Sequence, residues 1–131
     1  MQNNFPVDNP FLEYLGAKCL YANNIGCCIE LDIQPNLTNS WGKAHGGALM
    51  TLMDVSMSWA ARFYNQYHET GAMTINFNAS FLSSGTGLLI CNAKVIHKTL
   101  TLAFCESNII DTNNNLIASS SATFKYAKKL N

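Results

Sequence analysis

The chain has 131 residues and a formal net charge of zero, from eight Lys+Arg and eight Asp+Glu residues. This length is typical of one domain, so we expect a single domain over residues 1–131. Because 48% of the residues are apolar and only 12% are charged, the composition favours an oligomer that buries more surface than a small monomer can. The balanced charge suggests no clustered basic surface, which argues against a nucleic-acid partner.

The sequence also gives no sign of export or of a membrane anchor. Its first residues lack the basic and apolar regions of a secretory signal, and the longest apolar stretch, residues 48–61, is short and interrupted by Asp54. The five cysteines form no C-x-x-C pair, which favours reduced thiols. We therefore expect a cytoplasmic protein with no membrane contact. No Cys, His or Asp cluster has metal-ligand spacing, so we predict no metal and no cofactor.

Apolar periodicity and turn residues divide the chain into helices and strands. In chain order, the predicted elements are a helix over residues 10–15 capped by Asn9, strands over 17–22 and 27–33, a loop over 35–44, a helix from 46 to about 66, and strands over 73–81, 88–96, 100–110 and 116–126. The short connections between the later strands imply an antiparallel sheet that holds the long helix. We therefore expect an α+β fold.

The long helix and the strand after it carry the most informative patterns. Apolar residues spread around the whole circumference of the helix, which predicts burial on all sides. A sheet can cover only one side, so a second layer is needed, and a partner subunit could supply it. In the segment 73–81 apolar residues alternate with polar ones, which predicts one buried face. Its apolar members are Met73, Ile75, Phe77, Ala79 and Phe81.

Two features of the long helix point to chemistry. Asp54 is the only charged residue in this helix before Arg62. Either it faces water or caps a neighbouring backbone group, or it is a carboxylate held in an apolar setting for nucleophilic or general-base work. His45-Gly46-Gly47 stands at the helix start, where the first N–H groups have no intrahelical partner and can bind an oxygen that develops negative charge. A plain tight turn is the alternative interpretation.

Together these features resemble a known family. The string Asn39-x-x-Gly42-x-x-His45-Gly46-Gly47, with Asp54 after six further residues, resembles the hotdog-fold acyl-CoA thioesterases of the 4-hydroxybenzoyl-CoA thioesterase superfamily, above all the phenylacetate-pathway type. The segments 74–82 and 116–124 are similar to strands of that family, so the resemblance covers about residues 10–126. It implies a hotdog fold, with an antiparallel sheet wrapped around one long central helix, and a thioester hydrolase.

The resemblance also implies a role for each site residue. Asp54 would act as the nucleophile or as the base for a water molecule. The backbone N–H of Gly46, helped by Asn39, would bind the thioester oxygen. Thr74 would help to orient the water, and His45 would lie near the sulfur leaving group and settle the Gly-Gly turn.

Gly47 and Lys98 are the predicted contacts for coenzyme A. The family often has basic residues and a glycine at the turn between its fourth and fifth strands. Here the stretch His97-Lys98-Thr99-Leu100 contains no glycine and one firm cation. Lys98 could therefore meet a phosphate of coenzyme A, or it could be an ordinary solvated lysine of a turn.

Geometry makes a separate demand on the assembly. Gly46 and Asp54 are eight residues apart, which is about 12 Å along a helix, whereas an attacking carboxylate must lie about 3–3.5 Å from the carbonyl. Two antiparallel copies can supply both groups, Gly46 from one subunit and Asp54 from the other. The resemblance implies the same, a homodimer that usually pairs again into a homotetramer.

Two other functions compete with thioester hydrolysis. A hotdog protein could bind acyl-CoA or an acyl-carrier protein without hydrolysing it, but a pure binding pocket has little use for an isolated carboxylate such as Asp54. A hotdog dehydratase or hydratase usually needs a His and an acidic group that act on a β-hydroxyacyl chain, and the hydratase signature is absent. The sequence therefore favours an acyl-CoA thioesterase and leaves the acyl group open.

Overall fold

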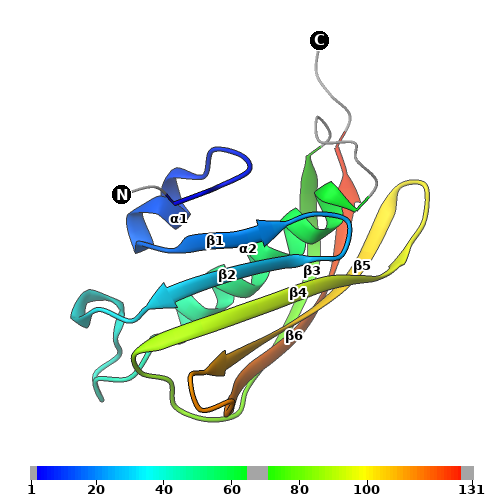
Figure 1. Ribbon diagram of the computed structural model, residues 1–131. Helices are drawn as coiled ribbons and strands as arrows, with labels where there is room; N and C mark the ends of the chain where they lie inside the picture. The colour runs from blue at the N-terminus through cyan, green and yellow to red at the C-terminus, as the bar shows by residue number, and fades with distance from the viewer. Residues whose placement is uncertain (1–2, 65–70, 128–131) are drawn as a thin grey trace.

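The computed structural model describes residues 3–64 and 71–127, which form one antiparallel sheet around a long helix (Figure 1). The elements are α1 (Pro10–Leu15), β1 (Lys18–Ala22), β2 (Cys27–Asp32), the short 3-10 helix η1 (Pro35–Leu37), α2 (Gly46–Phe63), β3 (Ala72–Phe81), β4 (Leu88–Lys98), β5 (Leu102–Asp111) and β6 (Leu116–Tyr126). The sheet has six strands in the order β1-β2-β4-β5-β6-β3, and all neighbours are antiparallel. The predicted α+β hotdog arrangement is confirmed.

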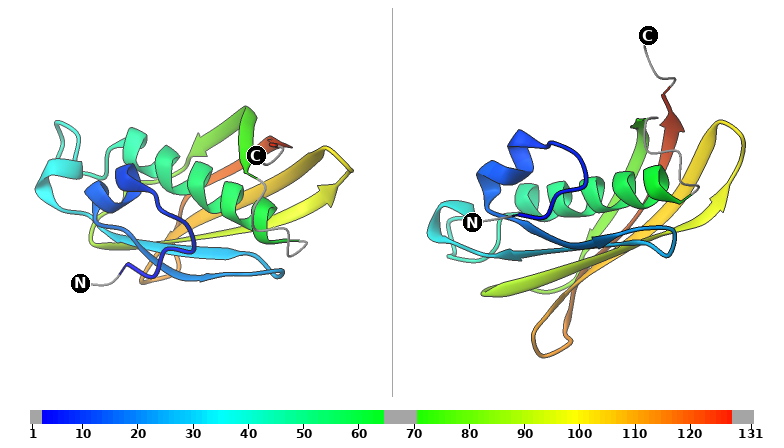
Figure 2. Two further views of the ribbon diagram at one scale, coloured as in Figure 1. Left: turned by 90° about the horizontal axis from the view of Figure 1, so that it is seen from above. Right: turned by 45° about the horizontal axis from the view of Figure 1, so that its top comes forward.

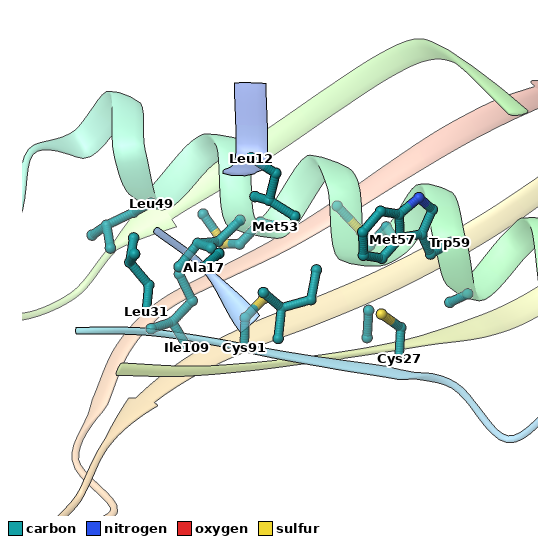
Figure 3. Packing of buried hydrophobic residues seen from close by; sticks show 14 of the residues in the cluster. Leu12, Ala17, Cys27, Leu31, Leu49, Met53, Met57, Trp59, Cys91 and Ile109 are labelled. Carbon is teal, nitrogen blue, oxygen red and sulfur yellow. The ribbon is translucent and has the colours of Figure 1, made fainter. Parts of the chain in front are cut away.

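The sheet curves around α2, which packs against its concave face (Figure 2). Met53 and Met57 are fully buried between this helix and the sheet, together with Cys91 and Ile109 of the sheet (Figure 3). On the other side of α2 lies α1, which contributes the fully buried Leu12 to the same core. The chain's own N-terminal segment therefore supplies part of the second layer that the helix requires.

The expectation that α2 is buried on all sides is only partly right. Met50 is 43% exposed, and Gly47, Thr51 and Asp54 on the same helical face are not fully buried either. No described segment covers this stripe, because α1 packs elsewhere on the helix. The helix ends at Phe63, and residues 65 and 66, which the prediction included, lie outside the described part of the chain.

The predicted buried face of the strand over residues 73–81 is only partly right. Phe77 and Ala79 of β3 are half-buried and pack against the core. Met73, Ile75 and Phe81 of β3 are 55%, 57% and 49% exposed. One physical reason is position, since β3 is the last strand of the sheet and has a neighbour on one side only. A second reason is a register shift between Thr74 and Asn76, which interrupts the alternation of side chains between the two faces.

The remaining boundaries lie within two residues of the predicted ones. Asn9 caps α1 as expected, because its Oδ1 accepts a hydrogen bond of 3.0 Å from the backbone N–H of Leu12. β5 begins at Leu102 rather than at residue 100, because Thr99 closes the turn: its N–H donates to the Leu102 carbonyl over 2.8 Å, and its hydroxyl accepts from the Leu102 N–H over 3.0 Å. Among the described helices, none is long and apolar enough to cross a membrane.

Candidate active site

Asp54 and Thr74 are joined by a direct hydrogen bond between α2 and β3. The Thr74 Oγ1 hydroxyl donates to Asp54 Oδ1 over 2.7 Å, and the second carboxylate oxygen accepts no hydrogen bond within the described residues. The two residues line an open hollow of about 330 Å³, together with Met50, Thr51 and Phe77. The carboxylate is the only charged group in this lining. Asp54 therefore faces a cavity that is otherwise built from hydroxyl, thioether and aromatic side chains.

The register shift in β3 is what brings Thr74 to the carboxylate. Thr74 pairs with the core residue Phe124, and Phe77 pairs with the buried Ala122. Residues that face each other on paired strands lie on the same side of the sheet, so Thr74 and Phe77 both point toward α2. In a regular strand, two residues three positions apart would point to opposite faces. A strict alternation would instead set Thr74 on the face opposite to Phe77.

The start of α2 presents a backbone amide that is free to bind an oxygen. The Nδ1 atom of His45, the N-cap residue, accepts a hydrogen bond of 2.8 Å from the N–H of Gly47. The N–H of Gly46, the first helical residue, has no intrahelical partner and donates to no acceptor within the described residues. The ring of Phe81 lies 3.8 Å from the position that a Cβ atom of Gly46 would occupy. The His45 side chain therefore bonds to the backbone of the Gly-Gly turn.

Asn39 shapes the loop that leads into α2. Its Oδ1 accepts hydrogen bonds from the N–H groups of Trp41, over 2.9 Å, and of Lys43, over 3.1 Å. Its backbone N–H donates to the Lys43 carbonyl over 2.8 Å. The side-chain oxygen is therefore occupied by the loop. Only the amide NH₂ group of Asn39 remains as a donor for a ligand.

Asn39 and Gly46 line a second hollow, of about 350 Å³, which shares no residue with the first. Its lining includes Phe81, Trp41 and Lys43, and Lys43 is the only charged residue in it. Gly46 and Asp54 stay about 12 Å apart along α2, as the helical rise requires. One chain therefore holds the predicted site residues in two separate groups, a carboxylate with a hydroxyl and a free amide with an asparagine.

Lys98 belongs to neither group. Its Nζ donates to the Thr99 carbonyl over 3.1 Å and lies 4.9 Å from the centre of the Tyr126 ring. The turn between β4 and β5 lies toward the C-terminal end of α2, whereas Gly46 is at the N-terminal end (Figure 2). Within one chain, Lys98 is therefore at the opposite end of the helix from the second hollow.

The cysteines are core residues, and neither hollow contains a thiol. Burial raises the pKa of Cys91 to about 12, and burial likewise raises the pKa of Cys105 to about 12. Both side chains are therefore neutral near pH 7, and a neutral thiol is a poor nucleophile. Among the described residues, no group of three or more His, Cys, Asp or Glu side chains could hold a metal ion.

Sequence reasoning missed several residues that line the hollows. Met50 and Thr51 precede Asp54 by four and three positions, so helical periodicity alone would have placed them on its face. Trp41 and Lys43 lie inside the Asn39–Gly46 string but were treated as spacers. The signal that could have found them is that an aromatic and a cationic residue lie within five positions of the predicted oxygen-binding amide of Gly46.

The fold and the two hollows define a hotdog protein with a carboxylate on its central helix. The sequence model of the thioesterase superfamily matches residues 42–118, more than half of the chain. The chain belongs to this family. The matched segment includes Gly46, Asp54 and Thr74, and it extends through β5 into β6.

A sequence relative and several solved structures are similar to the chain, and the solved structures share its fold. The chain is 26% identical over 115 residues to a candidate esterase of Mycobacterium tuberculosis, over 86% of this chain and 82% of the relative. The solved structure of that protein matches with a TM-score of 0.85 at 20% identity, over 94% of this chain and 99% of the other. The PaaI protein from the phenylacetic acid degradation operon of E. coli matches with a TM-score of 0.84 at 16% identity, over 93% and 87% of the two chains. A thioesterase from Haemophilus influenzae matches with a TM-score of 0.85 at 17% identity, over 92% and 85%.

Proposed function

We propose that the protein is an acyl-CoA thioesterase that hydrolyses its substrate to a free acid and coenzyme A. The observation that carries this proposal is the division of the site into two hollows. One holds the Asp54 carboxylate with its Thr74 hydroxyl, and the other holds the unpartnered N–H of Gly46. A thioester hydrolase needs both an attacking group and a donor for the oxygen of the tetrahedral intermediate. Family membership supports the same reaction class.

In the proposed reaction, the carbonyl oxygen of the thioester accepts a hydrogen bond from Gly46 N–H, and the Asn39 NH₂ group supports it. Asp54 either attacks the carbonyl carbon, forming an anhydride that water then cleaves, or removes a proton from an attacking water. The C–S bond breaks with its electron pair on sulfur, which takes up a proton to leave as the thiol. Thr74 holds one oxygen of Asp54, so the other is free to react. His45 keeps the turn in place near the sulfur.

The exposed side chains of β3 favour a dimer that joins the two hollows. Gly46 lies beside Phe81 at one end of β3, and Asp54 lies beside Thr74 near the other end. This edge of the sheet is unpaired in the single chain and exposes Met73, Ile75 and Phe81. An exposed edge strand with apolar side chains is a template for pairing with a second strand.

Antiparallel pairing of two β3 edges about a two-fold axis near Phe77 brings the hollows together. It places the Thr74 end of one strand beside the Phe81 end of its partner, and it does so twice because of the symmetry. Each Asp54 then approaches the Gly46 of the other subunit. Met50, midway between Gly46 and Asp54 on α2 and 43% exposed, would lie near the axis and become buried. The dimer therefore contains two composite sites, and further pairing into a tetramer leaves this geometry unchanged.

The test is a panel of aryl-, short- and medium-chain acyl-CoA thioesters, assayed for thiol release beside Asp54→Asn. The asparagine keeps an oxygen that accepts from Thr74, so the variant should fold and assemble like the wild type. Its turnover should fall at least about a hundredfold, the scale of losing a catalytic base. Full activity of Asp54→Asn would contradict the proposed mechanism, provided that light scattering shows an unchanged size. No thiol release from any thioester by the wild type would remove the function.

A further inference from the structure

The loop between Asn39 and Lys43 has a backbone fixed by hydrogen bonds and carries a tryptophan in solvent. The Trp41 side chain is 82% exposed. The backbone N–H groups of Trp41 and Lys43 both donate to the side-chain oxygen of Asn39. The loop is also closed by backbone hydrogen bonds, from Gly42 N–H to the Asn39 carbonyl and from Asn39 N–H to the Lys43 carbonyl. A large aromatic side chain on a fixed loop loses little conformational freedom when a ligand stacks on it.

The hollow beside Trp41 has a mixed lining, in which Leu49, Phe81 and Leu82 give it apolar walls and a single lysine gives it a positive charge. Lys43 is its only charged residue, and Ser83 and Ser84 add hydroxyl groups to its wall. The Asp54 hollow differs, since Met50 and Phe77 give it apolar walls and its single charge is negative. An acyl chain suits the apolar hollow, whereas a phosphate would be repelled there and attracted by Lys43. The two hollows therefore fit the two halves of an acyl-CoA.

We infer that Trp41 and Lys43 bind the nucleotide of coenzyme A, with the indole stacked on the purine and the ammonium group paired with a phosphate. This inference rests on the proposed function and adds to it the recognition of coenzyme A itself. The purine distinguishes coenzyme A from a carrier protein, which shares only the phosphopantetheine arm. Trp41 is five residues before Gly46, at most about 17 Å away along the chain, so a contact at one end of the arm is compatible with a thioester at the other.

Tryptophan fluorescence tests the contact directly, because the other tryptophan, Trp59, is only 2% exposed. Coenzyme A and adenosine 3′,5′-bisphosphate should both quench the emission of the wild type, whereas pantetheine, which lacks the nucleotide, should not. Trp41→Ala should abolish the quenching. Tyr14→Ala, which changes a 77% exposed aromatic side chain on α1, should keep it. Equal quenching by pantetheine, or quenching that survives in Trp41→Ala, overturns the inference.

Kinetics give a second and independent readout. Trp41→Ala should raise KM for an acyl-CoA about tenfold or more, since base stacking on an aromatic side chain is worth about 1–3 kcal/mol, with little change in kcat. Lys43→Gln should raise KM as well, whereas Lys125→Gln, on the outer face of the sheet, is the matched charge control. The same acyl group on N-acetylcysteamine lacks the nucleotide, so the Trp41→Ala penalty should vanish with it.

The outcomes separate this inference from the proposed function. Equal losses on acyl-CoA and on the N-acetylcysteamine thioester, or a change in oligomeric state in Trp41→Ala, would mean that Trp41 serves the fold or the subunit contact, and the inference falls. Hydrolysis of thioesters without any quenching by coenzyme A also overturns it, as does activity on an acyl-carrier protein alone. Quenching at Trp41 without hydrolysis of any thioester would support the inference and remove the proposed function.

Discussion

The two hollows of the chain differ in charge, in lining and in the element that shapes them. The hollow at Asp54 lies between the middle of α2 and β3, has mainly apolar walls and contains one anion. The hollow at Gly46 lies between the start of α2, its entry loop and the end of β3, has walls of mixed polarity and contains one cation. Neither has the full set of groups that thioester hydrolysis requires. The difference teaches that, under the proposed function, each hollow is half of a site, and two subunits must join before catalysis can occur.

The largest expected effect is the loss of the dimer, and with it the activity, when a charge is placed on the edge strand β3. Ile75→Lys places a charge on the exposed edge strand β3, where Ile75 is 57% exposed. We expect a folded monomer on light scattering and a loss of activity of at least about a hundredfold, because the base and the oxygen donor then never meet. Leu20→Lys, on the opposite edge strand β1 and 54% exposed, is the matched control and should stay active. An active monomer would contradict the account.

Removing one N–H group from the Gly46 hollow should cost nearly as much. Gly46→Pro deletes the proposed donor at the first helical position, where proline is well tolerated, and His45 already has the extended backbone, with ψ at 134°, that precedes proline. The expected loss in kcat is about a hundredfold to a thousandfold. Gly46→Ala retains the N–H, and its Cβ would be 3.8 Å from the Phe81 ring, so it should lose far less. Equal losses of kcat in Gly46→Pro and Gly46→Ala would mean that the added side-chain atoms, and not the missing N–H, cause the loss.

Removing the hydrogen bond that holds the Asp54 carboxylate should lower kcat by a smaller factor. Thr74→Val keeps the shape of the side chain but removes the hydrogen bond of 2.7 Å to Asp54. A hydrogen bond to a charged group contributes about 1.5–3 kcal/mol, so kcat should fall about tenfold or somewhat more. Thr74→Ser keeps the hydroxyl and should recover most of the rate. A Thr74→Val enzyme with wild-type kcat would leave the threonine without a positioning role.

The smallest effect concerns the core, which belongs to neither hollow. Burial raises the pKa of Cys91 and of Cys105 from 9.0 to about 12, and that of Tyr126 from 10.0 to about 12. Above pH 9 the unfolded chain therefore releases these protons first, and the free energy of unfolding should fall as the pH rises toward 12. Urea denaturation at about pH 8 and about pH 10.5 measures this. Equal stability at the two pH values would contradict the burial of these groups.

Much of the fold was predictable because its signals are local. The start of α2 at Gly46 and the turns between the later strands follow from periodicity and from turn residues. Asn39, His45, Gly46 and Asp54 were predicted as site residues because their spacing in the sequence resembles that of the thioesterase family. What a single helix cannot do, namely place Gly46 beside Asp54, was also predictable from its rise of about 1.5 Å per residue.

The parts that could not be predicted depend on pairing between distant segments. The alternation in β3 is regular in the sequence, but the strand lies at an edge because β6 returns beside it, and no local pattern contains that information. The register shift near Thr74 depends on the partner residues of β6, so the alternation of apolar and polar residues could not predict that Thr74 faces α2. The family resemblance alone assigned Thr74 to the site. The exposure of Trp41 follows from the way in which Asn39 folds the loop, which residue types alone do not specify.

The central claim, that each site takes one hollow from each subunit, can be tested by mixing two inactive variants. Asp54→Asn and Gly46→Pro are unfolded together and refolded together at equal amounts, and formation of mixed dimers is checked by mass spectrometry of differently tagged chains. In a mixed dimer one site combines the intact Gly46 of one subunit with the intact Asp54 of the other. We predict recovery of about a quarter of the wild-type activity, since half of the dimers are mixed and each has one intact site. Mixed dimers as inactive as their two parents would contradict the claim.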